Sequence, residues 1–221
     1  NMISELNSSF ENNLQLKIQE EKLNYQLLQS QINPHFLYNI LASVQNLLSF
    51  GEITKANKML ADLSLFYKGL LRTSNDLIPI KKELEIAQLY MEMEALCKDN
   101  LFDWNIDMEE GIENFLICKF TLQPILENSI QQGFKGNRIH MHIDISIRYD
   151  DDMIEIMISD NGIGMSPEKL NELREGIVSK QIHYEKHFGI SNINSRICSS
   201  LQGHGTLRDE RNKDTGTKIY I

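Results

Sequence analysis

The residues best suited to chemistry in the first half of the chain lie between Leu28 and Asn39, where Pro34 and His35 interrupt a helical pattern. Proline in a helix interior removes a backbone donor and clashes with the preceding turn, at a cost of about 3 kcal/mol. Neutral imidazole is a nucleophile near pH 7, so an outward-facing His35 could accept an electrophilic group. A histidine that packs or caps explains the same residue, and both interpretations stay open on this segment alone.

The second half of the chain holds further clusters. Glu127 and Asn128 put a carboxylate and an amide on the exposed side of a predicted helix, and such oxygen ligands suit Mg²⁺. Asp160 follows a predicted strand, where its carboxylate can accept a hydrogen bond from an exocyclic amine such as that of adenine. Gly162 and Gly164 let the backbone after it turn sharply and approach a ligand.

Gly189 stands before a predicted helix, whose free N–H groups and partial positive charge favour phosphate. Thr217 follows a glycine and opens the last predicted strand. Each cluster also has a purely structural interpretation: a surface Glu–Asn pair, a tight turn after a strand, or an ordinary glycine before a helix. Their order along the chain is therefore more informative than any one of them.

Composition narrows the class of protein. The chain has 221 residues, 41% hydrophobic and 24% charged, as expected of a globular protein of one or two domains. Its net charge of −9 and lack of a dense basic patch disfavour nucleic acid as a partner. The three cysteines have no Cys-x-x-Cys spacing, which disfavours a disulfide framework or zinc site and fits a reducing cytosol. We see no signal peptide and no apolar run of the roughly 20 residues that span a bilayer.

The elements that must position these residues are helical at first. Apolar residues recur at steps of mostly three or four over residues 3–50, which favours a coiled coil with a local stutter, although a helix packed on its own protein fits too. The pattern breaks at Gly51, and a second helix follows from about Thr54 to Leu71. Its apolar face is too wide for one hairpin to cover, so two copies are expected to close a four-helix bundle.

After Pro79 the sequence pattern changes from helices alone to a mixture of helices and strands. We expect a helix through Lys98, a strand over Leu101–Asp107 and a helix over Lys119–Gly133. Strict alternation predicts half-buried strands over His140–Arg148 and Met153–Ser159. A helix over Ser191–Leu201 and two strands near Thr206–Asp209 and Thr217–Ile221 complete an α+β half with helices on one face of a mixed sheet.

The order of the motifs resembles the ATP-binding domain shared by gyrase, Hsp90-type chaperones, histidine kinases and MutL (the GHKL or Bergerat fold). With the Asn-Pro-His-Phe-Leu-Tyr-Asn segment ahead of it, the chain resembles a LytS/YesM-type bacterial sensor histidine kinase. The resemblance implies a coiled-coil signalling helix over 1–24, a dimerisation and phosphotransfer hairpin over 25–78, and an α/β-sandwich catalytic domain over 79–221.

The resemblance also implies roles for single residues. His35 would be the phosphoacceptor, Asn128 would coordinate Mg²⁺, and Glu127 would orient that site or a proton. Asp160 would hold the adenine amine in a pocket shaped by two glycines, with a lid over Met165–Lys186. The remaining residues implied at the nucleotide are Gly162, Gly164, Gly189 and Thr217.

The implied function is ATP-dependent autophosphorylation on His35, followed by phosphoryl transfer to an aspartate of a response regulator receiver domain. The chain departs from the family motifs at Gln132, His187 and Cys97, where histidine, glycine and arginine are usual. A degenerate, weakly nucleotide-binding dimeric scaffold is therefore an alternative, and a GHKL-type ATPase is another. We expect a homodimer and a cytoplasmic fragment of a bacterial cell-membrane sensor, reaching the membrane only through segments upstream of this sequence.

Overall fold

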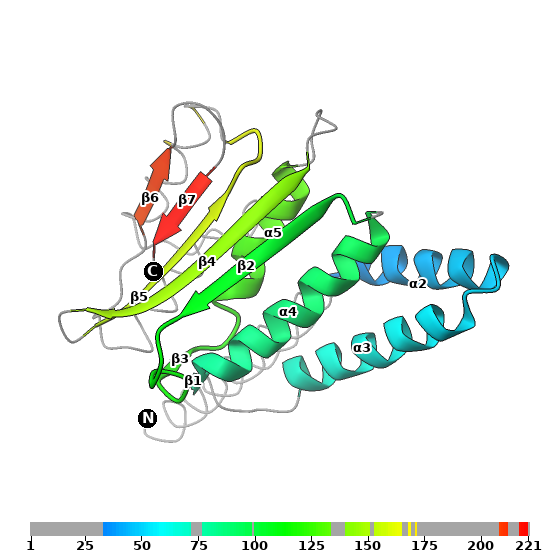
Figure 1. Ribbon diagram of the computed structural model, residues 1–221, viewed down its shortest axis with the longest axis horizontal. Helices are drawn as coiled ribbons and strands as arrows, with labels where there is room; N and C mark the ends of the chain where they lie inside the picture. The colour runs from blue at the N-terminus through cyan, green and yellow to red at the C-terminus, as the bar shows by residue number, and fades with distance from the viewer. Residues whose placement is uncertain are drawn as a thin grey trace, which may run out of the picture. The chain divides into compact units, whose positions relative to one another are not determined.

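A computed structural model describes residues 33–71, 77–98, 100–133, 140–150, 153–164, 168, 171, 208–211 and 217–220 (Figure 1). The chain divides into two compact units, Asn1–Glu52 and Ile53–Ile221. Residues 1–32, which include the predicted signalling coiled coil over 1–24, lie outside the described residues. So do the predicted helix over 191–201, Gly189 and most of the predicted lid over Met165–Lys186. The described residues form the predicted α+β fold.

Helix α2 (Pro34–Ser49) is the described part of the first unit. It begins at Pro34 and does not run through it, contrary to our expectation of a proline inside a helix. Asn33 is the N-cap, and its side-chain oxygen accepts a hydrogen bond from the Phe36 N–H at 3.2 Å. Proline at the first helical position loses no hydrogen bond, because that N–H has no intrahelical partner. The cost assigned to Pro34 from sequence therefore does not arise.

Helix α2 ends at Ser49, close to the break that the sequence predicts at Gly51. Gly51 has a φ of 75°, in the left-handed region that glycine adopts without strain. The N–H groups of Phe50, Gly51 and Glu52 donate to carbonyls in the last turn of α2 at 2.8–3.0 Å. These bonds satisfy carbonyls that would otherwise lack a partner at the helix end.

The second unit contains helices α3 (Ile53–Leu71), α4 (Ile80–Cys97) and α5 (Leu122–Gly133). Most of the predicted apolar face of α3 is buried, whereas Leu60 is 42% exposed. Lys58 on α3 pairs with Glu92 on α4 at 3.1 Å. Gly69 allows the two helices to approach closely, because a Cβ there would lie 3.1 Å from Ile86 Cγ1. The helix predicted after Pro79 is thus confirmed as α4, packed against α3.

A small two-stranded sheet precedes α4 and α5. Strand β1 (Leu77–Pro79) pairs antiparallel with β3 (Leu116–Cys118). The sequence did not predict either strand, since three residues are too few to show a period of two. The pairing joins segments that are distant in the sequence and fixes where the two helices begin.

The main sheet has the strand order β2-β4-β5-β7-β6. Its strands are β2 (Phe102–Met108), β4 (Met141–Asp150), β5 (Met153–Asp160), β6 (Arg208–Arg211) and β7 (Thr217–Tyr220). The β2–β4 pair is parallel and the other pairs are antiparallel, so the predicted mixed sheet is confirmed.

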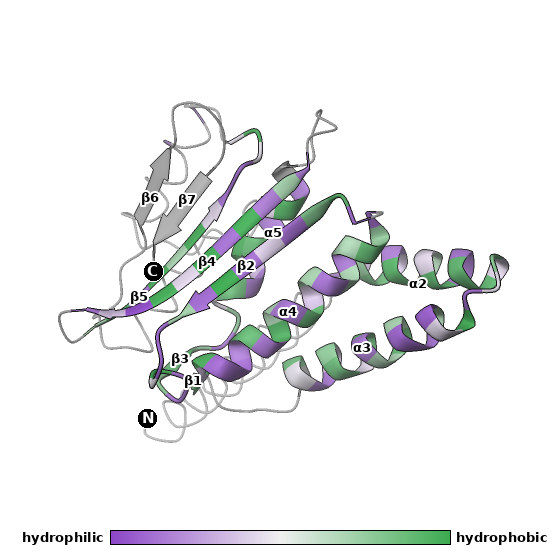
Figure 2. Cartoon of the chain, viewed as in Figure 1, coloured by the Kyte–Doolittle hydropathy of each residue, from purple (hydrophilic) through white to green (hydrophobic). Residues whose placement is uncertain are grey.

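Alternation along β4 separates the two faces of the sheet, as the hydropathy colours show in Figure 2. Met141, Ile143, Ile145 and Ile147 are buried, and the residues between them are half-buried. Helix α5 contacts both β5 and α4. Leu122, Ile125, Leu126 and Ile130 of α5 are fully buried, whereas Glu127 and Asn128 are half-buried. The core therefore fixes α5 beside the end of β5.

Candidate functional site

Asp160 lies at the end of β5 and is half-buried. It pairs in register with Ile143, whose side chain is on the buried face of the sheet. Its Oδ2 accepts a hydrogen bond from the Ser129 hydroxyl at 2.9 Å, and its Oδ1 accepts one from the Gly162 N–H at 3.0 Å. An ionised carboxylate acts only as an acceptor, which suits it to the amine of a ligand.

Ser129 is a residue to which sequence reasoning assigned no role. It is 8% exposed and stands on α5, one position after Asn128. Its bond to Asp160 connects residues that are 31 positions apart, so nothing local in the sequence indicated it. The bond holds the Asp160 carboxylate in place and connects α5 to the end of β5.

The glycines after Asp160 differ in their backbone conformations. Gly164 has a φ of 69°, in the left-handed region, and Gly162 is buried. A side chain at Gly164 would be strained, since residues with a Cβ seldom adopt this conformation. Thr217 is the residue of β7 directly opposite Asp160 in the antiparallel pairing. The structure therefore places the backbone of Thr217 next to that of Asp160, the predicted adenine ligand.

Glu127 and Asn128 are next to each other on α5, at the level of Ser129. The Gln131 amide donates to Glu127 Oε1 at 2.9 Å. On α4, the pKa of the Tyr90 hydroxyl is raised well above its ordinary value, first by burial and then by the carboxylates of Glu94 and Glu127. Glu127 therefore lies near Tyr90 of α4, and both Glu127 and Asn128 are half-buried.

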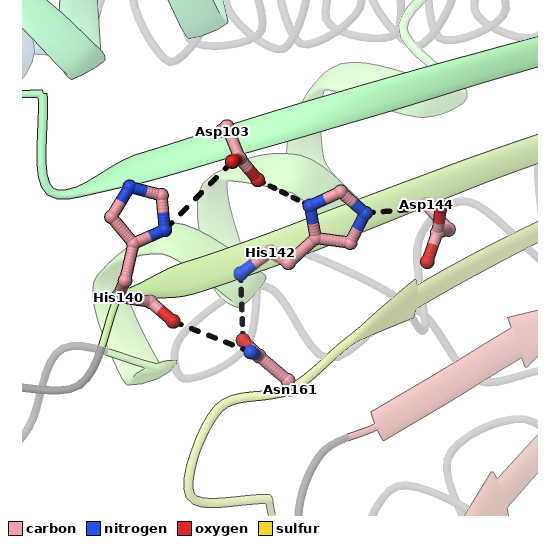
Figure 3. A network of polar contacts seen from close by, with 5 residues as sticks. All are labelled: Asp103, His140, His142, Asp144 and Asn161. Atoms are coloured by element: carbon pink, nitrogen blue, oxygen red, sulfur yellow. Dashed lines mark hydrogen bonds and ion pairs between the residues drawn. The ribbon is translucent and has the colours of Figure 1, made fainter.

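Asn161, between Asp160 and Gly162, attaches this loop to the start of β4 (Figure 3). Its Oδ1 accepts a hydrogen bond from the His142 N–H at 2.7 Å, and its amide donates to the His140 carbonyl at 3.3 Å. Its own backbone N–H donates to the His142 carbonyl at 3.2 Å. Three bonds thus fix the residue that follows the predicted adenine ligand.

The same end of β4 carries a polar cluster of imidazoles and carboxylates (Figure 3). His142 Nδ1 is hydrogen-bonded to Asp103 on β2, and His142 Nε2 lies 3.2 Å from Asp144 Oδ1. The bond to Asp103 raises the pKa of His142 above its ordinary value, and the same bond lowers the pKa of Asp103. The printed contacts make the cluster a network of hydrogen bonds and His–Asp pairs. Among the described residues no group of three or more metal-binding side chains could hold an ion.

His35 belongs to the first unit and is exposed, in the first turn of α2. The Asn39 amide nitrogen lies 3.4 Å from His35 Nδ1, one helical turn further along. Phe36, directly after His35, is buried, with 2% of its surface exposed. The helix therefore buries the neighbour of His35 while leaving the imidazole accessible to a reactant.

Within the second unit, the structure brings Asp160 together with Ser129 of α5, the Gly162 N–H and the backbone of Thr217. Glu127 and Asn128 directly precede Ser129 on α5, and their predicted roles stay predictions. None of the described helices is long and apolar enough to cross a bilayer.

Comparison with known proteins defines the class. Residues 23–101 match the histidine kinase family model, and residues 118–221 match the model of histidine kinase-, DNA gyrase B- and HSP90-like ATPases. Together the two models account for most of the chain, including His35 and every residue of the candidate nucleotide site. The chain belongs to the histidine kinases.

Similar curated proteins narrow the family further. Sensor protein LytS of Bacillus cereus is 29% identical over 195 residues, which are 87% of this chain and 32% of the relative. LytS of Oceanobacillus iheyensis is 32% identical over 199 residues (88% and 33%), and the sensor histidine kinase YesM of Bacillus subtilis is 27% identical over 220 residues (100% and 36%). The predicted LytS/YesM-type resemblance is confirmed. The chain spans about a third of the length of these relatives.

A solved structure described as a bacterial phosphotransferase superposes with a TM-score of 0.51 at 10% identity, covering 87% of this chain and 94% of that one. At this identity the match shows the fold alone, and it agrees with the α+β architecture.

Proposed function

We propose that the chain is the kinase portion of a two-component sensor that phosphorylates His35 from Mg·ATP and then passes the phosphoryl group to an aspartate of a response regulator. The observation that carries the proposal is the arrangement around Asp160: a half-buried carboxylate that accepts hydrogen bonds from Gly162 and from Ser129, the residue that follows Glu127 and Asn128 on α5. It lies in an ATPase-type domain on the same chain as an exposed histidine.

The nucleotide roles follow from the chemistry of each group. Asp160 accepts a hydrogen bond from the exocyclic amine of adenine, because an ionised carboxylate is an acceptor only and the Ser129 and Gly162 donors hold it in place. The Asn128 amide oxygen is a ligand of Mg²⁺, a cation that retains most of its waters and takes few protein ligands. Glu127 orients that site. Gly164 keeps the loop after β5 in a turn that leaves room for the base.

In the transfer step, a nitrogen of the neutral His35 imidazole attacks the γ-phosphorus of ATP. A P–N bond forms as the P–O bond to ADP breaks, and the imidazole N–H proton passes to solvent. Phosphoryl transfers of this kind depend mainly on positioning and charge neutralisation. A strong base is not required, which agrees with a buried Phe36 where an acidic neighbour would otherwise stand.

The proposal includes a homodimer built on the helices of residues 25–78. Helix α2 exposes Tyr38, Leu41 and Leu48, and α3 exposes Leu60 and Leu65. Exposed apolar residues repeated along two helices favour burial against a second copy. We retain the division into a coiled coil over 1–24, a hairpin over 25–78 and a catalytic domain over 79–221, and a location at the cytoplasmic side of the cell membrane in the full-length sensor.

Labelling with γ-labelled ATP tests the kinase. The parent should give a phosphoprotein that is labile to acid and stable to base, since protonation turns the nitrogen of a P–N bond into a good leaving group. His35→Gln should abolish the label and leave ADP binding unchanged, because the side chain is exposed. His140→Gln, an exposed histidine of the second unit, is the matched control and should label normally.

Label that persists in His35→Gln would overturn the mechanism. A parent that binds ATP tightly without becoming labelled would favour the scaffold alternative raised by Gln132 and His187.

A further inference from the structure

A turn of three residues, Lys119 to Thr121, lies directly before α5 and meets two other helices. Phe120 has a φ of 61°, a left-handed conformation that residues with a Cβ rarely adopt. Thr121 is 2% exposed, and its hydroxyl donates to the Cys118 carbonyl at 2.6 Å. A strained turn of this kind persists only where its surroundings hold it.

Glu83 of α4 holds the turn from one side. It is 2% exposed, its Oε1 accepts a hydrogen bond from the Leu122 N–H at 3.0 Å, and its Oε2 accepts one from the Phe120 N–H at 3.2 Å. Leu122 is the first residue of α5, where N–H groups have no intrahelical partner and negative charge is favoured. Glu83 therefore caps α5 from a different helix and fixes the left-handed turn.

Lys119 holds the turn from the other side. It is 6% exposed, and its ammonium donates to the Leu70 carbonyl in the last turn of α3. The same ammonium lies 4.9 Å from the centre of the Phe120 ring. The last carbonyls of a helix also lack intrahelical partners, so Lys119 caps the end of α3. One turn thus connects the end of α3 to the start of α5.

We propose that Glu83 and Lys119 are positioning residues that couple the C-terminal end of α3 to α5 and so set where Asn128 and Ser129 stand relative to Asp160. The consequence for nucleotide binding rests on the function proposed above. Ser129 is within two helical turns of Leu122 and already contacts Asp160, so a displaced helix start moves both Asn128 and Ser129. Asp160 itself is on β5 and stays in the sheet.

Two measurements on Glu83→Gln, Lys119→Met and the double variant test the coupling. The first is amide hydrogen exchange in residues 66–71 and 122–128. Each single variant should speed exchange in both segments, by about 10-fold, as expected for the loss of one hydrogen bond to a charged group. Lys119→Arg keeps a cationic donor and should give rates closer to those of the parent than Lys119→Met does, in both segments.

The second measurement is ADP affinity with and without Mg²⁺. The gain in affinity that Mg²⁺ provides should fall by about 10-fold in Glu83→Gln, while metal-free affinity changes less, since Asn128 moves and Asp160 does not. Glu94→Gln is the matched control: Glu94 is 5% exposed on the same helix and lies 3.5 Å from Lys98. It should alter neither the exchange of the two segments nor the effect of Mg²⁺.

Independent effects would overturn the coupling. In that case Glu83→Gln would speed exchange only in residues 122–128, and Lys119→Met only in residues 66–71. The double variant would then show the sum of the two effects, with no interaction between them. If Glu83→Gln does not fold, Lys119→Met and Lys119→Arg decide alone, by the exchange of residues 122–128. A parent that fails to bind ADP would contradict the proposed function, whereas the exchange data would still decide whether the junction couples α3 to α5.

Discussion

In the proposed function, Asp160 and Asn128 serve different steps of nucleotide binding. Asp160 is held from both sides by protein donors at 2.9 and 3.0 Å, and its charge makes it an acceptor only. Asn128 stands on a helix and presents an amide oxygen suited to a hydrated divalent cation. The difference in chemistry predicts a difference in how metal affects binding to each variant.

Asp160→Asn should weaken ADP binding whether or not Mg²⁺ is present, because an amide nitrogen replaces an acceptor next to the adenine amine. Asn128→Asp should leave metal-free ADP binding near that of the parent and change only the contribution of Mg²⁺. Calorimetry with ADP, with and without the metal, separates the two. Equal losses in both variants under both conditions would contradict these roles.

The pair of Asp103 and His142 predicts a pH dependence of stability. The pKa of His142 is raised from 6.5, so its contribution is complete below that pH and is lost as pH rises through the raised value. The pKa of Asp103 is lowered from 3.8, so its contribution is present above that pH and is lost as pH falls through the lowered value. The pair therefore stabilises the fold most between these two limits.

Asp103→Asn should lower the free energy of unfolding at pH 5.5 and have less effect at pH 8.5. The difference should stay below about 1 kcal/mol, because the pair is exposed and screened by solvent. Urea unfolding at the two pH values measures it. Asp107→Asn is the control, since Asp107 on the same strand pairs with an arginine, Arg148, in place of a histidine. A loss for Asp103→Asn that is constant with pH would refute the assignment.

At the scale of elements, α2 shows that a proline can begin a helix as well as interrupt one. Asn33 provides the N-cap and Pro34 the first helical residue, so His35 stands in the first turn. Periodicity alone did not distinguish this start from a continuous helix, since apolar spacing is the same on both sides of a cap.

Pro34→Ala should change stability by less than about 1 kcal/mol, because proline at the first position of a helix sacrifices no hydrogen bond. A proline inside the helix would instead give a stabilisation of about 3 kcal/mol on replacement. Asn33→Ala should destabilise by about 1 kcal/mol through loss of the cap, and Asn33→Ser should recover most of it. Thermal or urea unfolding of the three variants distinguishes the two placements of Pro34.

At the scale of the whole molecule, the proposed dimer rests on apolar side chains that each unit leaves exposed. Leu41 is 41% exposed on α2 and Leu65 is 53% exposed on α3. Light scattering at micromolar concentration should give about twice the chain mass of 25.6 kDa. A monomer at that concentration would refute the bundle.

Leu65→Glu should shift the protein towards monomer, because it places a charge in the proposed interface without disturbing a buried site. Leu101→Glu serves as the control: Leu101 is 48% exposed but lies between α4 and β2, outside the proposed bundle. If the Leu65→Glu variant remains as dimeric as the control, the dimer interface does not include Leu65 and lies elsewhere.

The sequence by itself determined the class of protein and most of the elements in the described residues. Alternation along β4 and β5 is a local property with a period of two, so it revealed both strands and their buried faces before the structure did. The break at Gly51 and the extent of α4 could also be predicted, because both depend on residues close together in the sequence. The order of the motifs was sufficient for the resemblance to LytS and YesM, because it needs only residue types and their spacing.

Only the tertiary structure decided how the residues of the site are held. The bond between Ser129 and Asp160 joins positions 31 apart, and that between Glu83 and Leu122 joins positions 39 apart. The pairing of β1 with β3 and the parallel pairing of β2 with β4 also join segments that are distant in the sequence. Such contacts arise when buried polar groups find partners across the fold, and no periodicity along the chain encodes which partner each will have.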